Sequence, residues 1–301
     1  MRRIFLHIAL VWPLCAVAQE PWIWSQYMFN LYEANIAYAG NPEAVYVSAH
    51  HRVQWTGWEG APLMSNAIVQ APFFDGKMGC GLTVSTERVG AHRASVAEMA
   101  WAYKLRMGAS SVLSFGLSGG VVQQTFFPDE LSARDEEQWF LQAQQVSAVT
   151  PRAGAGVFFN SKRFFVGVDA TNLNNPAAKL YEGFFGPALR EFRFVSGLAI
   201  PINKYWVLRP STMLRTRPNG QVSADISLCV FWNEKIWFGA GLRPGHGYTG
   251  MLDWSVSRRL RVGFSADLTI ARWSFMPPSH EVFISYYFNR GANRPPSIRY
   301  F

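Results

Sequence analysis

Alternation of apolar and polar residues along nearly the whole chain is the sequence feature that most constrains its fold. Over residues 260–268, for example, every second side chain is apolar, and the positions between are polar, charged or glycine. A period of two places alternate side chains on opposite faces of a β-strand. About fourteen stretches of this kind, each of roughly ten residues, are predicted as strands. They begin near Ala44, Leu63, Met78, Ala94, Ser111, Arg152, Arg163, Glu191, Tyr205, Gln221, Ile236, Tyr248, Arg259 and His280.

The connections between these stretches alternate in length. Every second connection is short, and one of them is the tight-hairpin sequence Asp75-Gly76. The connections between them are mostly longer, as at 126–151 and 172–190. Outer-membrane barrels have short turns on the periplasmic side and long loops outside. The pattern therefore predicts an even number of strands and both termini in the periplasm.

The composition agrees with a sheet whose outer face meets lipid. The chain has 12 Trp, 11 Tyr and 23 Phe, and only 16% of its residues are charged. No run of about 18 apolar residues follows the first segment, so helical membrane spans are not predicted. Backbone groups in hydrocarbon must pair within the protein, so a sheet there closes on itself. The predicted fold class is all-β, a transmembrane antiparallel β-barrel of outer-membrane type.

Charged side chains in the predicted strands fall on the face opposite the apolar one. A charge displaced to lipid at mid-depth would cost about 2–4 kcal/mol, so this sorting predicts a lumen that encloses the charges. Both signs are present, which favours a lattice of ion pairs over an ion-selective ring. The candidate lattice residues are Arg52, Glu98, Asp169, Arg193, Arg209, Asp225, Arg261, Asp267 and Glu281.

The chain divides into successive segments. Residues 1–18 have a basic head, an apolar stretch and the small-residue sequence Ala16-Val17-Ala18, which indicates a cleaved signal peptide. Residues 19–43 form an N-terminal segment, and residues 44–288 form the barrel. Residues 289–301 hold two prolines and three arginines and are predicted to be a flexible tail or to bind a partner. An exported barrel is predicted to reside in the outer membrane of a Gram-negative bacterium.

The sequence SQYMFNLYEANIAYAG, at residues 25–40, is rich in aromatic side chains and fits neither a helical nor a strand period. It closely resembles the start of the PorP/SprF family of type IX secretion system membrane proteins, in which Q-F-S-Q-Y-M-F-N-x-x-x-x-N-P-A-Y-A-G follows the signal. The usual proline after the asparagine is Ile36 here. A second phrase, HHRVQWTGWEGAP at 50–62, resembles R-x-Q-W-x-G-x-x-G-A-P, and the resemblance returns in SHEVFISYYF at 279–288.

The resemblance implies a protein of the machine that exports proteins across the outer membrane and, in some species, supports gliding motility. It implies partners among periplasmic ring or peptidoglycan-binding components, or one secreted adhesin. The interpretation is a structural, partner-binding barrel surrounded by outer-membrane lipid. The alternative is a transport barrel for small or hydrophobic solutes.

The N-terminal segment has two possible roles. It can fold into the barrel as a plug, because a barrel of about fourteen strands is wider than side chains alone fill easily. Alternatively, it can dock a periplasmic partner, since exposed aromatic clusters invite association. The candidate residues for either role are Gln26, Tyr27, Met28, Phe29, Asn30, Asn35, Tyr38 and Gly40.

Other chemistry is not predicted. His50 and His51 point to opposite faces of a strand and cannot share a metal ion. Ser279 and His280 are likewise separated by adjacency, so no catalytic pair is expected and the protein is not predicted to be an enzyme. No cofactor motif and no basic run with interleaved aromatics is present, so neither a cofactor nor nucleic acid is expected.

Overall fold

The computed structural model describes residues 24–42, 44–108, 110–130, 145–174, 190–218, 222–233, 235–271 and 274–288. The predicted signal peptide at 1–18 and the tail at 289–301 lie outside the described residues. Among the described residues, no helix has the length and apolar character needed to cross a membrane.

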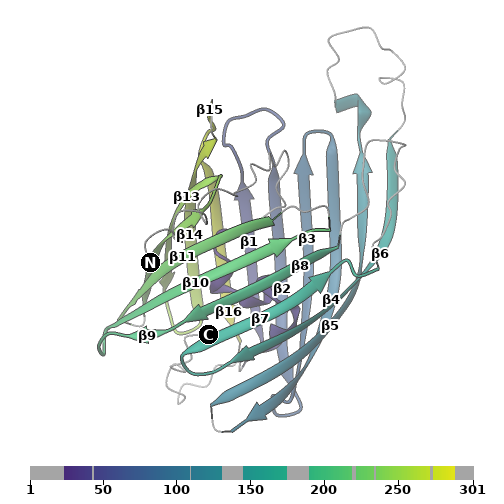
Figure 1. Cartoon of the computed structure of the whole chain (residues 1–301). Coiled ribbons are helices and arrows are strands. Elements are labelled where there is room, and N and C mark those ends of the chain that lie inside the picture. The colour runs from purple at the N-terminus through teal and green to yellow at the C-terminus, as the bar shows by residue number, and fades with distance from the viewer. Residues whose placement is uncertain are drawn as a thin grey trace, which may run out of the picture.

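Fourteen antiparallel strands form a closed barrel (Figure 1). In chain order they are β1 (Tyr46–Val53), β2 (Leu63–Phe73), β3 (Met78–Val89), β4 (His92–Met107), β5 (Ser111–Phe126), β6 (Val146–Asn160), β7 (Phe164–Thr171), β8 (Glu191–Leu198), β10 (Trp206–Thr216), β11 (Val222–Trp232), β12 (Ile236–Arg243), β13 (Gly247–Ser255), β14 (Leu260–Ala271) and β16 (Ser279–Tyr287). Two short pieces, β9 (Ile200–Pro201) and β15 (Ser274–Phe275), pair with β10 and β14. A 3₁₀ turn, η3 (Pro128–Glu130), follows β5.

Each strand pairs with its neighbours in the chain, and the first strand pairs with the last. β1 meets β16 with Ala49 opposite Ile284, and β10 meets β11 with Thr212 opposite Ile226. No strand of the barrel is therefore left with an unpaired edge, which is the condition for a sheet in hydrocarbon.

The predicted strand starts agree with the structure to within two residues, except for the sixth. β6 begins at Val146, six residues before the predicted start at Arg152. The connection predicted at 126–151 ends at Pro151, and proline cannot donate a ladder hydrogen bond. Instead Pro151 lies within β6, opposite Val121. The loop predicted at 126–151 is accordingly shorter than expected.

Alternate residues of the strands face outward and inward, as the period of two predicts. Large apolar side chains such as Leu117 and Leu268 are more than 60% exposed on the outer face. Polar and charged residues occupy the buried positions between them, such as Ser118 and Asp267. Within a membrane the exposed face meets lipid, and the polar face lines the lumen.

Residues 24–40, called the lumen segment below, lie inside the barrel (Figure 1, purple). They form three short turns, η1 (Tyr27–Phe29), α1 (Leu31–Ala34) and η2 (Ile36–Tyr38). Their side chains and backbone groups contact strands from all around the barrel, among them β1, β6, β7, β11 and β14.

Candidate functional site

The lumen and the lumen segment together hold most of the buried polar groups of the molecule. Nearly every residue from Trp24 to Gly40 is buried, and only Glu33 and Tyr38 are partly exposed. A segment buried on all sides has no polar face and no apolar face, so it shows no hydrophobic period. Asn35 fixes the local geometry, because its side chain accepts a hydrogen bond from the N–H of Ala37 at 2.9 Å.

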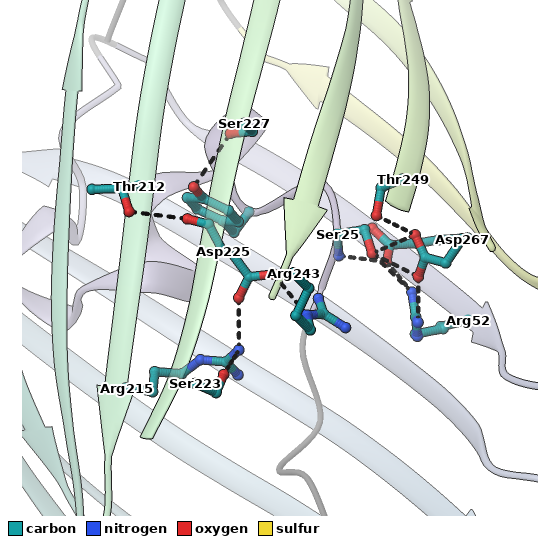
Figure 2. A network of polar contacts seen from close by, with 12 residues as sticks. Ser25, Arg52, Thr212, Arg215, Ser223, Asp225, Ser227, Arg243, Thr249 and Asp267 are labelled. Atoms are coloured by element: carbon teal, nitrogen blue, oxygen red, sulfur yellow. Dashed lines mark hydrogen bonds and ion pairs between the residues drawn. The ribbon is translucent and has the colours of Figure 1, made fainter. Parts of the chain in front are cut away.

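The amino end of the lumen segment binds two wall carboxylates. Glu281 accepts hydrogen bonds from the backbone N–H groups of Ser25 at 2.9 Å and Gln26 at 3.1 Å. The Ser25 hydroxyl donates to Asp267 at 2.8 Å (Figure 2). Arg52 pairs with both carboxylates, at 2.5 Å from Asp267 and 3.2 Å from Glu281. This arrangement balances part of the buried negative charge, as burial of ionised groups requires.

Glu33 anchors the middle of the lumen segment. Its carboxylate lies 2.7 Å from Nδ1 of His50 and accepts a hydrogen bond from Asn66 at 2.8 Å. His50 also stacks on Phe283, with ring centroids 4.4 Å apart. Neutral contacts continue toward the end with the short turns, where Asn30 donates to Ser48 and accepts from Gln70, both at 3.2 Å.

An ion pair on the opposite wall binds the second half of the lumen segment. Asp169 accepts the backbone N–H of Ile36 at 3.1 Å and pairs with Arg193. Arg193 donates a further hydrogen bond to the carbonyl of Glu33 at 2.9 Å. Asn35 donates to the carbonyl of Val157 at 3.2 Å.

The carboxyl end of the lumen segment sits at the end of the wall that carries the short turns. Lys104 donates a hydrogen bond to the carbonyl of Gly40. Gly40 has a φ of +59° and lies so close to β2 and β3 that a Cβ atom would approach the Ala71 carbonyl oxygen to 2.3 Å and the Cα atom of Gly79 to 2.5 Å. Only glycine meets both demands, the left-handed backbone and the close approach.

Apolar packing fills the remaining lumen beside the segment. Tyr27, Met28 and Phe29 belong to a buried cluster with wall residues that include Trp237 and Met251. Tyr38 packs edge-on against Phe158, with centroids 5.2 Å apart. The Tyr27 hydroxyl lies 3.4 Å from Ser227, and burial raises the pKa of Tyr27 to about 12.

A second polar network lines the lumen on β10, β11 and β12 (Figure 2). Asp225 pairs with Arg215 at 2.9 Å and with Arg243 at 2.8 Å. Opposite charges on neighbouring strands therefore meet in this part of the lumen. Three further lattice residues have other partners on the wall: Arg261 pairs with Asp253, Glu98 contacts Arg152 and Ser118, and Arg209 lies over the rings of Phe165 and Trp237.

Glycines of the wall make room for the lumen segment. A Cβ atom built on Gly116 would lie 2.5 Å from the Cα atom of Ala37, and one on Gly79 would lie 2.1 Å from the carbonyl oxygen of Ala39. Similar conflicts arise at Gly81 with Tyr32 and at Gly263 with Gln26. The wall is therefore shaped around this segment at several separate strands.

The structure places all the candidate residues of the N-terminal segment in the lumen and brings six of the lattice residues to the segment. Five make hydrogen bonds to it, namely Arg52, Asp169, Arg193, Asp267 and Glu281. The sixth, Arg261, lies over the ring of Phe29 at 5.6 Å from its centroid. Sequence reasoning did not single out Glu33, Ser25 or Lys104. Glu33 was detectable as the only charge of residues 25–40.

Other reactive groups are dispersed. Within the described ranges, no group of three or more His, Cys, Asp or Glu side chains is arranged to hold a metal ion. Cys80 and Cys229 are both free, and Cys229 lies in the lumen 3.7 Å from the sulfur of Met251.

The closed antiparallel sheet with an apolar exterior and a polar, filled lumen defines a membrane β-barrel of outer-membrane type. The sequence matches the family described as type IX secretion system membrane protein PorP/SprF over residues 16–286, and the chain belongs to that family. No match was found among curated proteins.

Solved structures with a similar fold are outer-membrane barrels. The outer-membrane protein Omp33 of Acinetobacter baumannii is 9% identical, with a TM-score of 0.51, over 83% of this chain and 100% of that chain. The toluene transporter TodX of P. putida is 11% identical, with a TM-score of 0.50, over 85% of this chain and 92% of that chain. At such low identity these likenesses show the fold alone.

Proposed function

We propose that the protein is an outer-membrane component of the type IX secretion system that acts as a structural, partner-binding scaffold, with its lumen closed by its own lumen segment. The single observation that carries the proposal is the burial of that segment against charged residues of the wall. The bonds from Glu281, Asp169, Arg193 and Lys104 hold it at both ends and in the middle. A pore would require that these buried ionic contacts be broken.

A closed lumen directs partner binding to the ends of the barrel. At the end with short turns, Phe74 stands at the tip between β2 and β3 and is 74% exposed. Its φ of +49° is unusual for a bulky side chain, and such strain concentrates at functional positions. Arg106 of the neighbouring hairpin donates to the carbonyl of Asp75 at 3.1 Å, which braces the turn. We assign this turn to contact with periplasmic components of the secretion system.

Affinity purification from native outer membranes, followed by mass spectrometry, tests the proposal. The wild-type chain is expected to retain periplasmic or secreted components of the type IX system. Phe74→Asn removes the aromatic ring but suits a left-handed backbone, so it is expected to lose the periplasmic components without loss of stability.

The matched control is Trp58→Asn in the loop between β1 and β2, at the other end of the barrel. Trp58 is also exposed, at 52%, and its replacement should leave periplasmic components bound. Purification of the wild-type chain without any secretion component would contradict the proposed function. Equal loss in the two variants would contradict the assignment of the turn.

A further inference from the structure

Charged wall residues bind five main-chain groups of the lumen segment. Carboxylates accept three backbone N–H groups, those of Ser25 and Gln26 on Glu281 and that of Ile36 on Asp169. Cations donate to two carbonyls, that of Glu33 from Arg193 and that of Gly40 from Lys104. Hydrogen bonds to ionised groups are the strong ones, and these five depend on the peptide backbone and not on side-chain identity.

The wall also admits the backbone at close range. Gly79 and Gly116 stand where the main chain of Ala39, Gly40 and Ala37 touches β3 and β5. Glycine at a wall position permits a close approach by another backbone. Ionic groups and glycines together thus form a binding site for a peptide main chain.

The direction of the lumen segment shows how such a site is reached. Gly40, at its tethered end, contacts Gly79, the second residue of β3 at the end with short turns. Ser25, near its amino end, binds Arg52 and Glu281, which lie near the ends of β1 and β16 that face the long loops. The amino end of the occupant therefore lies toward the side of the long loops.

We infer that the lumen is a peptide-binding site whose present occupant is the lumen segment, and that a peptide segment of another exported chain binds there in trans when it displaces this occupant. The inference rests on the proposed function, because it supplies the scaffold with a peptide ligand. The short connection 41–45 tethers the occupant, and a tether of this length gives an effective concentration on the order of mM. A competing peptide must overcome that advantage.

The experiment removes the tether from the complete protein. A protease site is inserted within 41–45, the full chain is folded in detergent, and the connection is cut. The probe is a fluorescent synthetic peptide of residues 19–41, and its binding is followed by anisotropy. We expect the cut segment to exchange for the probe with a saturable affinity, whereas the uncut protein binds the probe at least a hundredfold more weakly.

Backbone esters test the main-chain contacts directly, because an ester lacks the N–H and keeps the side chain. Esters at Ser25, Gln26 and Ile36 are each expected to weaken binding by about tenfold or more. The matched control is an ester at Leu31, the first residue of α1, whose N–H lies outside the helical ladder. It should change the affinity less than threefold.

Three results would overturn the inference: no exchange in a folded, cut barrel, exchange that is not saturable, or equal affinity of all four ester peptides. If cutting unfolds the barrel, the probe is added instead while a chain lacking residues 19–41 refolds, and the same criteria apply. The proposed function fails separately, when no secretion component purifies with the intact chain.

Discussion

The barrel wall and the lumen segment are stabilised by different kinds of contact. Each strand of the wall repeats one local rule, with apolar residues outward, polar residues inward and backbone bonds to two neighbours. The lumen segment has no such rule, and its position depends on single contacts to many strands. Some use its backbone, as Ile36 does with Asp169, and others use its side chains, as Ser25 does with Asp267 and Glu33 with His50. The comparison teaches that the wall tolerates many substitutions that keep the pattern, whereas the segment depends on individual contacts that no repeated pattern replaces.

The largest expected loss of stability comes from replacing Arg52, whose guanidinium group contacts both the wall and the lumen segment. Arg52→Met leaves the carboxylates of Asp267 and Glu281 buried without this partner, and loss of one member of a buried pair costs about 3–5 kcal/mol. Unfolding of the detergent-folded protein by guanidinium chloride measures the loss. The control is Arg88→Met, because Arg88 pairs with Glu130 at the exposed surface, where a pair contributes about 0–1 kcal/mol. Equal losses would contradict the account.

A charge introduced on the outer face is expected to lower the stability of the wall without changing a contact of the lumen segment. Leu117→Arg places a cation on the exposed face of β5, where the cost in lipid is about 2–4 kcal/mol at mid-depth. Val149→Arg, near the first residue of β6 and similarly exposed, is the control and should cost about 0–1 kcal/mol. Folding equilibria in lipid vesicles measure both. A Leu117→Arg variant as stable as the wild type would show that this face does not meet lipid.

A small substitution at the boundary tests the fit between wall and segment. In Gly116→Ala the new methyl group would meet the backbone of Ala37, and such overpacking costs about 1–3 kcal/mol. Gly119→Ala, three residues along the same strand, meets nothing within 4 Å and serves as the control. Thermal unfolding of the two variants should separate them. Indistinguishable curves would mean that the wall does not hold the segment closely.

The smallest effect concerns the pH dependence of one contact inside the segment. Tyr27→Phe removes a hydroxyl contact with Ser227 and is expected to cost about 1 kcal/mol at neutral pH. The pKa of Tyr27 is raised above its unfolded value, so its contribution is fully present below pH ~10 and is lost as the pH rises toward 12. The variant should therefore lose less stability than the wild type over that range, in unfolding curves recorded at fixed pH. A parallel loss in both would contradict the buried position of Tyr27.

The wall was largely predictable from the sequence, because its rule is local. Alternation gave the fourteen strands and the inward charges, and the family resemblance gave the type IX assignment, which the family match confirms. The predicted start of β6 was wrong because Pro151 was assigned to the loop. In the structure Pro151 lies within the ladder between β5 and β6. The low strand propensity of proline was outweighed at this position by the pairing of β6 with β5.

The contacts of the lumen segment were not predictable in detail. The pairing of Asp169 with Arg193 joins adjacent strands, but that of Arg52 with Asp267 joins residues more than 200 positions apart, which no local pattern records. The wall glycines carry only part of this information, because alternation places Gly116 on the lumen face but does not show that it meets the backbone of Ala37. Contacts of this kind are seen only in the closed barrel, where strands far apart in the sequence face one another.

The central claim, that the lumen segment closes the barrel, is tested most directly by single-molecule conductance in planar lipid bilayers. The wild-type protein and a variant that lacks residues 19–40 are inserted under the same conditions. We predict that the wild type shows no steady current and that the shortened barrel conducts ions. A wild-type barrel that conducts, or a folded shortened barrel that stays as closed as the wild type, would contradict the account.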